Sequence, residues 1–90
     1  MKKNINLENR KFVLDCIKSA FEGGYLPMID MRTVEIECHS DGKEENLICG
    51  YYTVICNTIA GRDCRLRIWE DADETDTENV INGIDILCIA

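Results

Sequence analysis

The spacing of apolar residues changes once along this chain, and that change constrains the fold more than any other feature. As far as Phe21, apolar residues recur every three or four positions, as they do along one side of an α-helix. Beyond Pro27 they alternate with polar residues, which is typical of strands with one buried face. The sequence therefore predicts an α+β fold, in which an N-terminal amphipathic helix packs on one face of an antiparallel β-meander of about four strands.

The helix is predicted over about residues 6–22. Its apolar side is formed by Leu7, Val13, Leu14, Cys16, Ile17, Ala20 and Phe21. Asn6 is the expected N-cap, and Glu8 suits the positive end of the helix dipole. Gly23–Gly24, followed by Pro27, is expected to end the helix.

Four strands are predicted to follow, at about residues 33–39, 46–57, 64–70 and 84–90. The dipeptide Asp41–Gly42 favours a two-residue hairpin turn between the first two strands. Such a turn sets Ile36 opposite Leu47 and Val34 opposite Cys49. The apolar side chains of the two strands would then share one face of the sheet.

The next hairpin turn is predicted at Ala60–Gly61, a register that sets Ile55 opposite Leu66 and Tyr52 opposite Trp69. The face predicted under the helix consists of Val34, Ile36, Cys49, Tyr51, Ile55, Leu66 and Ile68. The other face would carry Glu35, Glu37, His39, Ile48, Tyr52, Val54, Cys56, Arg65, Arg67 and Trp69. The centre of that second face is too apolar to meet water without a reason.

Length and composition limit the classes of protein. A chain of 90 residues suits one core, so residues 1–90 are expected to form a single domain. No apolar segment resembles a signal peptide or a membrane span, so we expect a cytoplasmic protein without a membrane partner. The six cysteines are then expected to be reduced. Because they form no C-x-x-C pair, and His39 follows Cys38 on the opposite side of a strand, we expect no metal and no cofactor.

The charge of the chain is concentrated near its end. Acidic and basic residues are equal in number before Glu70, 10 of each, so the net charge of −7 comes entirely from the segment that follows. That segment begins with the sequence EDADETDTE. Its six carboxylates form the first candidate partner-binding site: Glu70, Asp71, Asp73, Glu74, Asp76 and Glu78.

Four interpretations of residues 70–82 remain open. The segment could be a solvated loop, or it could contain a short helix that begins at a Thr75–Glu78 capping box and ends at Asn82–Gly83. It could hold a weak divalent cation site, although Asp76 stands where the loop of an EF-hand requires glycine. Finally, it could be an electronegative surface that docks on a basic cleft, because dense charge steers association and selects partners.

The uncovered face of the predicted sheet is the second candidate site. Its proposed contact residues are Tyr52, Arg65, Arg67 and Trp69. Aromatic residues and arginine often anchor protein contacts, so a foreign protein or a homodimer is the expected use. Stacking of RNA bases is less favoured, because Glu35, Glu37 and the acidic segment would repel phosphates; direct nucleic-acid binding is not expected. The remaining option is that the C-terminal segment folds over this face.

Catalysis is not expected. His39 is the only histidine, no Ser or Cys is placed as its nucleophile, and no Gly-rich phosphate loop precedes a helix. We expect a small acidic protein-binding module, most concretely an inhibitor that occupies the nucleic-acid-binding surface of a nuclease or defence complex. Its size and charge are similar in kind to those of small phage-encoded anti-CRISPR and anti-restriction proteins, without a diagnostic family motif. The alternative is a structural or assembly subunit, or a ligand-binding homo-oligomer, that uses the Tyr52/Trp69 face.

Overall fold

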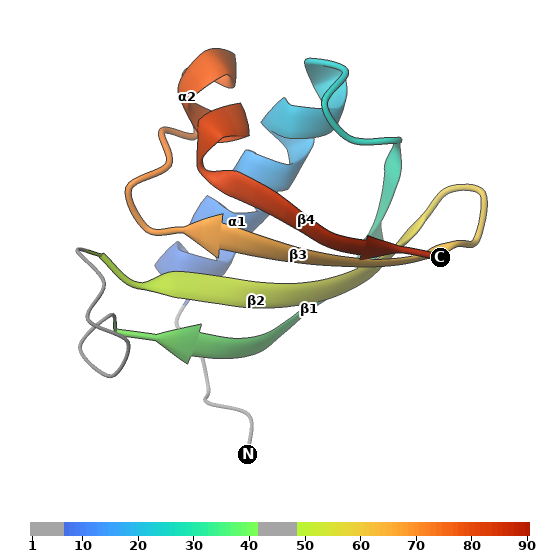
Figure 1. Ribbon diagram of the computed structural model, residues 1–90, viewed down its shortest axis with the longest axis horizontal. Coiled ribbons are helices and arrows are strands. Elements are labelled where there is room, and N and C mark those ends of the chain that lie inside the picture. Colours follow the sequence, from blue (N-terminus) through green and yellow to red (C-terminus); the bar gives the residue numbers. More distant parts are fainter. Residues whose placement is uncertain (1–6, 42–48) are drawn as a thin grey trace.

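The computed structural model describes residues 7–41 and 49–90, which form two helices and one four-stranded sheet (Figure 1). In chain order the elements are α1 (Leu7–Glu22), β1 (Ile29–Ser40), β2 (Tyr51–Thr58), β3 (Asp63–Trp69), α2 (Thr77–Asn82) and β4 (Ile84–Ile89). The strands lie in the order β1-β2-β3-β4, and each neighbouring pair is antiparallel. The predicted α+β fold, an N-terminal helix with an antiparallel meander, is confirmed. The predicted N-cap Asn6 and residues 42–48 lie outside the described part.

A buried stripe at helical spacing holds α1 against the sheet. Val13, Cys16, Ile17 and Ala20 are fully buried, whereas Leu7, predicted on the same side, is 85% exposed. Figure 1 shows α1 lying across one face of the sheet, with α2 beside it near the start of β4. No described helix lies over the opposite face, which we call the open face. Burial of each large side chain under α1 contributes roughly 1.5–3 kcal/mol to stability.

The end of α1 is where the sequence predicts it. Gly24 has a φ of 83°, in the left-handed region that glycine adopts without steric cost. The backbone N–H of Gly23 donates to the Ser19 carbonyl and that of Tyr25 to the Ala20 carbonyl, both at 2.9 Å. These bonds satisfy carbonyl groups that the last turn of a helix otherwise leaves unpaired.

The predicted register of the β2–β3 hairpin is wrong by one residue. Val54 pairs with Leu66, and Tyr52 pairs with Ile68 rather than with Trp69. The reason is the length of the turn: the last pair is Asn57 with Asp63, and the residues between them are five, an odd number. A one-residue shift moves every side chain of a strand to the other face of the sheet.

The shift reverses β2 and leaves β3 as predicted. Tyr52, Val54 and Cys56 are buried on the α1 side, although the sequence predicts them on the uncovered face. Tyr51 and Ile55 lie on the open face instead of under the helix. The other residues predicted under α1 are buried as expected, namely Val34, Ile36, Leu66 and Ile68. The residues of β3 predicted on the open face, Arg65, Arg67 and Trp69, alternate with the buried residues of that strand.

The first predicted hairpin is also wrong. Ile36 pairs with Val54 rather than with Leu47, and Ser40 pairs with Tyr51, so the connection between β1 and β2 is longer than two residues. Cys49, predicted within a strand, precedes β2 and is half-buried.

The strand β1 begins at Ile29, before its predicted start at residue 33, and its pairing is irregular between Asp30 and Glu35. Thr33 fills this irregularity: its hydroxyl donates to the Asp30 carbonyl at 2.7 Å and accepts the Asn57 N–H at 2.8 Å.

Substitution of Leu66 by alanine tests the buried face. Leu66 is fully buried on the α1 side, so Leu66→Ala is expected to lower the free energy of unfolding by about 2–5 kcal/mol. The matched control is Leu7→Ala, which removes the same atoms from an exposed position and is expected to change stability by less than about 0.5 kcal/mol. Urea denaturation measures both, and equal effects would contradict the placement of α1.

Candidate protein-binding surfaces

Three side chains at one end of the open face form a compact cluster, which we call the Arg67 cluster. Tyr51 of β2 and Trp69 of β3 are paired across the two strands, and their ring centroids are 5.3 Å apart in an edge-on arrangement. The guanidinium carbon of Arg67 lies 4.5 Å from the Tyr51 ring centroid and 5.7 Å from that of Trp69. Each such cation–π contact contributes about 0.5–2 kcal/mol, depending on its exposure to solvent.

The cluster is held in place by its neighbours on β4. Trp69 donates its indole N–H to a carboxylate oxygen of Asp85 at 2.9 Å, and Asp85 is also the backbone partner of Arg67. No salt bridge joins Arg67 to a carboxylate within residues 7–41 and 49–90. Its positive charge therefore faces two aromatic rings, while Tyr51 is only 7% exposed and Trp69 is half-buried. Part of both Arg67 and Trp69 remains at the surface.

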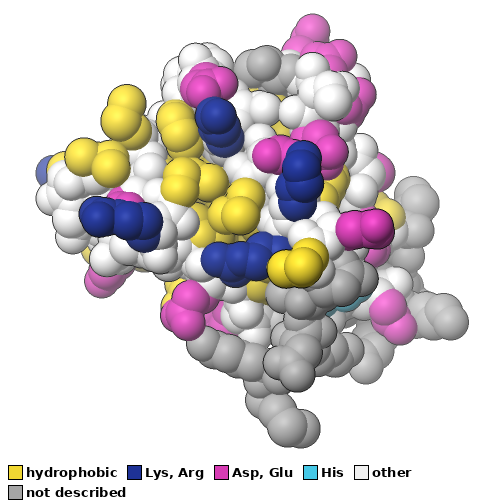
Figure 2. Space-filling model, turned by 180° about the vertical axis from the view of Figure 1, so that it is seen from behind, with side chains coloured by type: hydrophobic (Ala, Val, Ile, Leu, Met, Phe, Trp, Pro, Cys, Tyr) yellow, Lys and Arg dark blue, Asp and Glu magenta, His cyan; other side chains and the backbone are white. Residues whose placement is uncertain are grey.

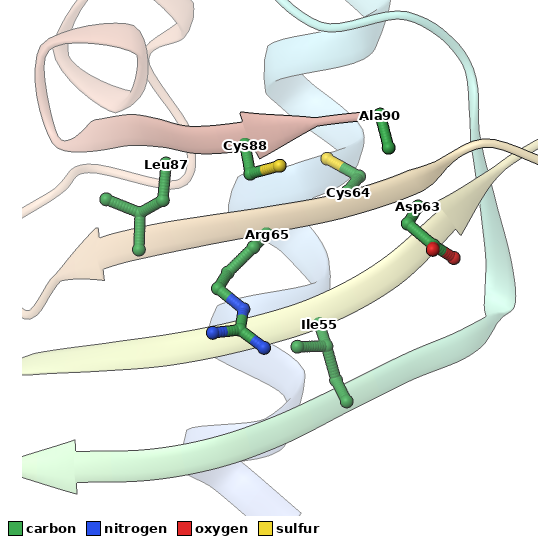
Figure 3. A pocket seen from close by; sticks show the side chains of 7 residues that line it. All are labelled: Ile55, Asp63, Cys64, Arg65, Leu87, Cys88 and Ala90. Atoms are coloured by element: carbon green, nitrogen blue, oxygen red, sulfur yellow. The ribbon is translucent and has the colours of Figure 1, made fainter.

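The open face continues from this cluster into a shallow hollow of about 670 Å³ that spans β2, β3 and β4 (Figure 3). Its lining residues are Ile55, Asp63, Cys64, Arg65, Leu87, Cys88 and Ala90. Figure 3 shows Arg65 and Ile55 side by side from neighbouring strands, with α1 on the far side of the sheet. The Arg65 guanidinium lies 3.5 Å from the carboxylate of Glu37. The hollow is therefore lined mainly by apolar side chains, with Arg65 in its middle (Figure 3).

One of the four residues predicted for this surface lies on the other side of the sheet. Tyr52 is 3% exposed, and its ring stacks on His39 at a centroid distance of 4.4 Å and lies 6.0 Å from Phe12 of α1. His39, predicted on the uncovered face, accordingly lies on the α1 side. Tyr51 occupies the open-face position that the sequence predicts for Tyr52. Only the odd number of residues in the turn after Asn57 could have indicated that Tyr51, and not Tyr52, lies on the open face.

Several carboxylates of the acidic segment have partners within the chain. A carboxylate oxygen of Glu70 lies 3.1 Å from Nε2 of His39, an ion-pair distance that lacks hydrogen-bond geometry. Asp73 accepts hydrogen bonds from the backbone N–H of Thr75 at 3.0 Å and from its hydroxyl at 2.7 Å. These two bonds hold the pKa of Asp73 below its usual value. These acids are therefore partly structural.

The short helix α2 is the second structural use of the acidic segment. Asp76 is its N-cap and accepts the backbone N–H groups of Glu78 at 3.1 Å and Asn79 at 3.4 Å. The sequence predicts Thr75 as this cap, one residue too early. Gly83 ends the helix as predicted, and Val80 is fully buried in the core.

The acidic end of the molecule is joined to α1 through one further bond, in which the Ser19 hydroxyl donates to the Glu74 carbonyl at 2.9 Å. Seen from behind (Figure 2), acidic side chains gather toward the end where Figure 1 shows α2. Lys and Arg lie among hydrophobic side chains over the middle of that view. The charge asymmetry of the sequence is thus also an asymmetry of the surface.

Two of the cysteines, Cys16 and Cys56, are poorly placed for chemistry. Burial raises the pKa of Cys16 and of Cys56 to about 12, so both thiols stay protonated at neutral pH and are weak nucleophiles. His39 lies between the Tyr52 ring and Glu70. Within the described residues no three His, Cys, Asp or Glu side chains are grouped so that they could hold a metal ion.

Comparisons of the chain with family models, with curated proteins and with solved structures found no match. Neither described helix is long and apolar enough to cross a membrane. The surfaces described above are therefore the basis for any functional interpretation.

Two substitutions of the N-cap residue of α2 distinguish the effect of its charge on stability from the effect of capping. Asp76→Ala removes the acceptor of two backbone N–H groups and is expected to lower stability by about 0.5–2 kcal/mol. Asp76→Asn removes the charge but keeps a good N-cap, so its stability should stay close to that of the wild type. Urea denaturation of the two variants gives the comparison, and equal losses would show that charge rather than capping determines the effect.

Proposed function

We propose that this protein is a small binding module that recognises another protein through the open face and performs no catalysis. The observation that carries the proposal is the Arg67 cluster, which lies on a sheet face without a covering helix among the described elements. Trp, Tyr and Arg are the residue types that dominate the energetics of protein interfaces. Their occurrence together, already packed against one another, supports this use.

The geometry of the cluster explains how it would bind with a small entropic cost. Tyr51 is buried and Trp69 is fixed by its bond to Asp85, so neither ring must be ordered when a partner arrives. The Arg67 guanidinium lies against the two rings and forms no salt bridge with a described carboxylate, so it retains N–H donors for an acceptor on the partner. The mainly apolar hollow beside it, with Arg65 in its middle, would add contact area.

A second candidate function uses the acidic end. In this version the protein is an inhibitor that covers the basic nucleic-acid-binding surface of a nuclease or defence complex by steric and electrostatic means. The observation in its favour is the concentration of carboxylates toward α2 (Figure 2). Among the described contacts, the side chains of Glu74 and Glu78 take part in neither the Asp73 turn nor the Asp76 cap, so their charge serves no local bond there.

Affinity capture with matched variants tests the first function. The partner is identified by capture from an extract followed by mass spectrometry, and its Kd is then measured with purified proteins. Arg67→Gln and Trp69→Ala are each expected to weaken binding by at least about 2 kcal/mol, roughly 30-fold in Kd. The control Arg32→Gln removes an exposed arginine that is paired with Asp30 on β1 and should leave Kd unchanged. Unchanged affinity in both cluster variants would refute the open face as the binding surface.

The same assay distinguishes the second function. A variant that neutralises Asp71, Glu74 and Glu78 keeps the local bonds of Asp73 and Asp76 and so preserves the fold. If the acidic end docks on a basic partner, this variant should lose both affinity and its dependence on salt concentration. Wild-type affinity and salt dependence would exclude the acidic end as the contact.

A further inference from the structure

Among the described residues, exposed apolar side chains are concentrated along β4. Within residues 7–41 and 49–90, the large hydrophobic residues that are more than one-third exposed are Leu7, Tyr25, Met28, Ile59, Ile86, Leu87 and Ile89. Three of these seven belong to β4 itself, a strand of six residues. Met28 and Ile59 line a second hollow together with Ile89. We call Met28, Ile59, Ile86, Leu87 and Ile89 the β4 strip.

The strand β4 is also an edge of the sheet. It pairs with β3 on one side, and no described strand lies on its other side. Ile86 is the backbone partner of the fully buried Leu66, yet it is 40% exposed, because α1 and α2 do not extend over the outer side of β4. An apolar edge strand exposes backbone donors and acceptors together with hydrophobic side chains. A second strand that pairs with this edge forms hydrogen bonds to the backbone groups and covers the side chains.

The opposite edge, β1, is protected in the ways that natural sheets use. Its pairing with β2 is interrupted twice, and Arg32, Glu35 and Glu37 place charges along it. The strand β4 has one charged residue, Asp85, and one interruption, where Leu87 is left without a partner on β3. The bulge at Leu87 and the hydrogen bond from the Tyr25 hydroxyl to the Ile84 carbonyl, at 3.1 Å, oppose edge pairing, but β4 carries fewer charges and fewer interruptions than β1.

We propose that two copies of this chain pair through β4, antiparallel about a twofold axis near Leu87, and form a continuous eight-stranded sheet. This axis is perpendicular to the sheet, so both open faces lie on the same side and both Arg67 clusters stay accessible. The inference is independent of the identity of any foreign partner.

A second copy fits this edge because the two ends of β4 differ in charge. A polar hollow at its N-terminal end is lined by Asp71, Asp73 and Gly83. At its C-terminal end, Arg62 lines the hollow that contains Ile89, and Arg65 is the backbone partner of Cys88. Antiparallel pairing sets the acidic end of one copy against the arginine-bearing end of the other.

The apolar surface gives a further argument for this occupant. The twofold axis brings each β4 strip against itself, so the apolar surface of each copy is covered by the same kind of surface. Asp63 reduces the positive charge at the arginine-bearing end. Charge therefore mainly determines the direction in which the two strands pair, and backbone hydrogen bonds and apolar contacts stabilise the dimer.

Native cysteines provide the test. Cys88 on β4 and Cys38 on β1 are both exposed, one on each edge of the sheet. In the proposed dimer the two Cys88 residues lie within about 10 Å, roughly two strand spacings, whereas the two Cys38 residues are separated by all eight strands. A short bismaleimide of about that reach should therefore produce a covalent dimer of the wild type and of Cys38→Ser, and none of Cys88→Ser. Gel electrophoresis under reducing conditions reads the result.

Solution mass from light scattering completes the experiment. The wild type should have twice the mass of the 10.3 kDa chain, Leu87→Lys should be a folded monomer by circular dichroism, and Leu7→Lys should remain a dimer. The proposal would be overturned if the wild type were monomeric at all concentrations, even if its β4 edge bound a foreign extended peptide. Cross-linking through Cys38 would overturn it as well. Arg67→Gln should stay dimeric, so failure of the open face as a binding surface is separable from failure of the dimer.

Discussion

The register between β2 and β3 is the constraint on which the rest of the structure depends. The turn after Asn57 contains an odd number of residues, and this sets Val54 against Leu66 and Tyr52 against Ile68. Those pairs form the surface on which α1 packs. The same register sends Tyr51 to the open face beside Trp69, so the core and the Arg67 cluster arise from one alignment. A shift of this register by one residue would bury the Arg67 side chain or expose the core. Both changes would lower the stability of the fold.

The acidic segment combines two roles that are separable in space. Three of the carboxylates have contacts within the chain: Glu70 lies close to His39, Asp73 forms the turn around Thr75, and Asp76 caps α2. The side chains of Glu74 and Glu78 accept none of the hydrogen bonds of that turn or that cap, and Glu78 lies in the first turn of α2, where the helix dipole favours a negative charge. The density of carboxylates is thus partly explained by their contacts within the fold. Any role of the segment in binding would depend on the carboxylates without such contacts among the described residues, Glu74 and Glu78.

The sequence predicts the elements better than their alignment. The helical spacing and the Gly–Gly ending identify α1, and alternation identifies the β3 strand. The sequence of β2 is apolar on both faces, so its pattern cannot decide whether Tyr51 or Tyr52 faces the helix. That choice is made by the turn after Asn57, where Gly61 has a φ of 84° and allows a longer loop than the predicted one. In the same way Thr75 and Asp76 are both good N-cap residues, so the sequence pattern alone does not decide between them, and the structure has Asp76 as the cap.

The most direct test of the account is the pattern of proton NOEs among the aromatic rings. The structure places the Tyr52 ring beside Phe12 of α1, with centroids 6.0 Å apart, and the Tyr51 ring beside Trp69. Assigned NOESY spectra should therefore show Tyr52–Phe12 and Tyr51–Trp69 cross-peaks. The opposite pattern, Tyr51 with Phe12 and Tyr52 with Trp69, would restore the register with Tyr52 on the open face. It would contradict the alignment from which both the core and the proposed binding surface are derived.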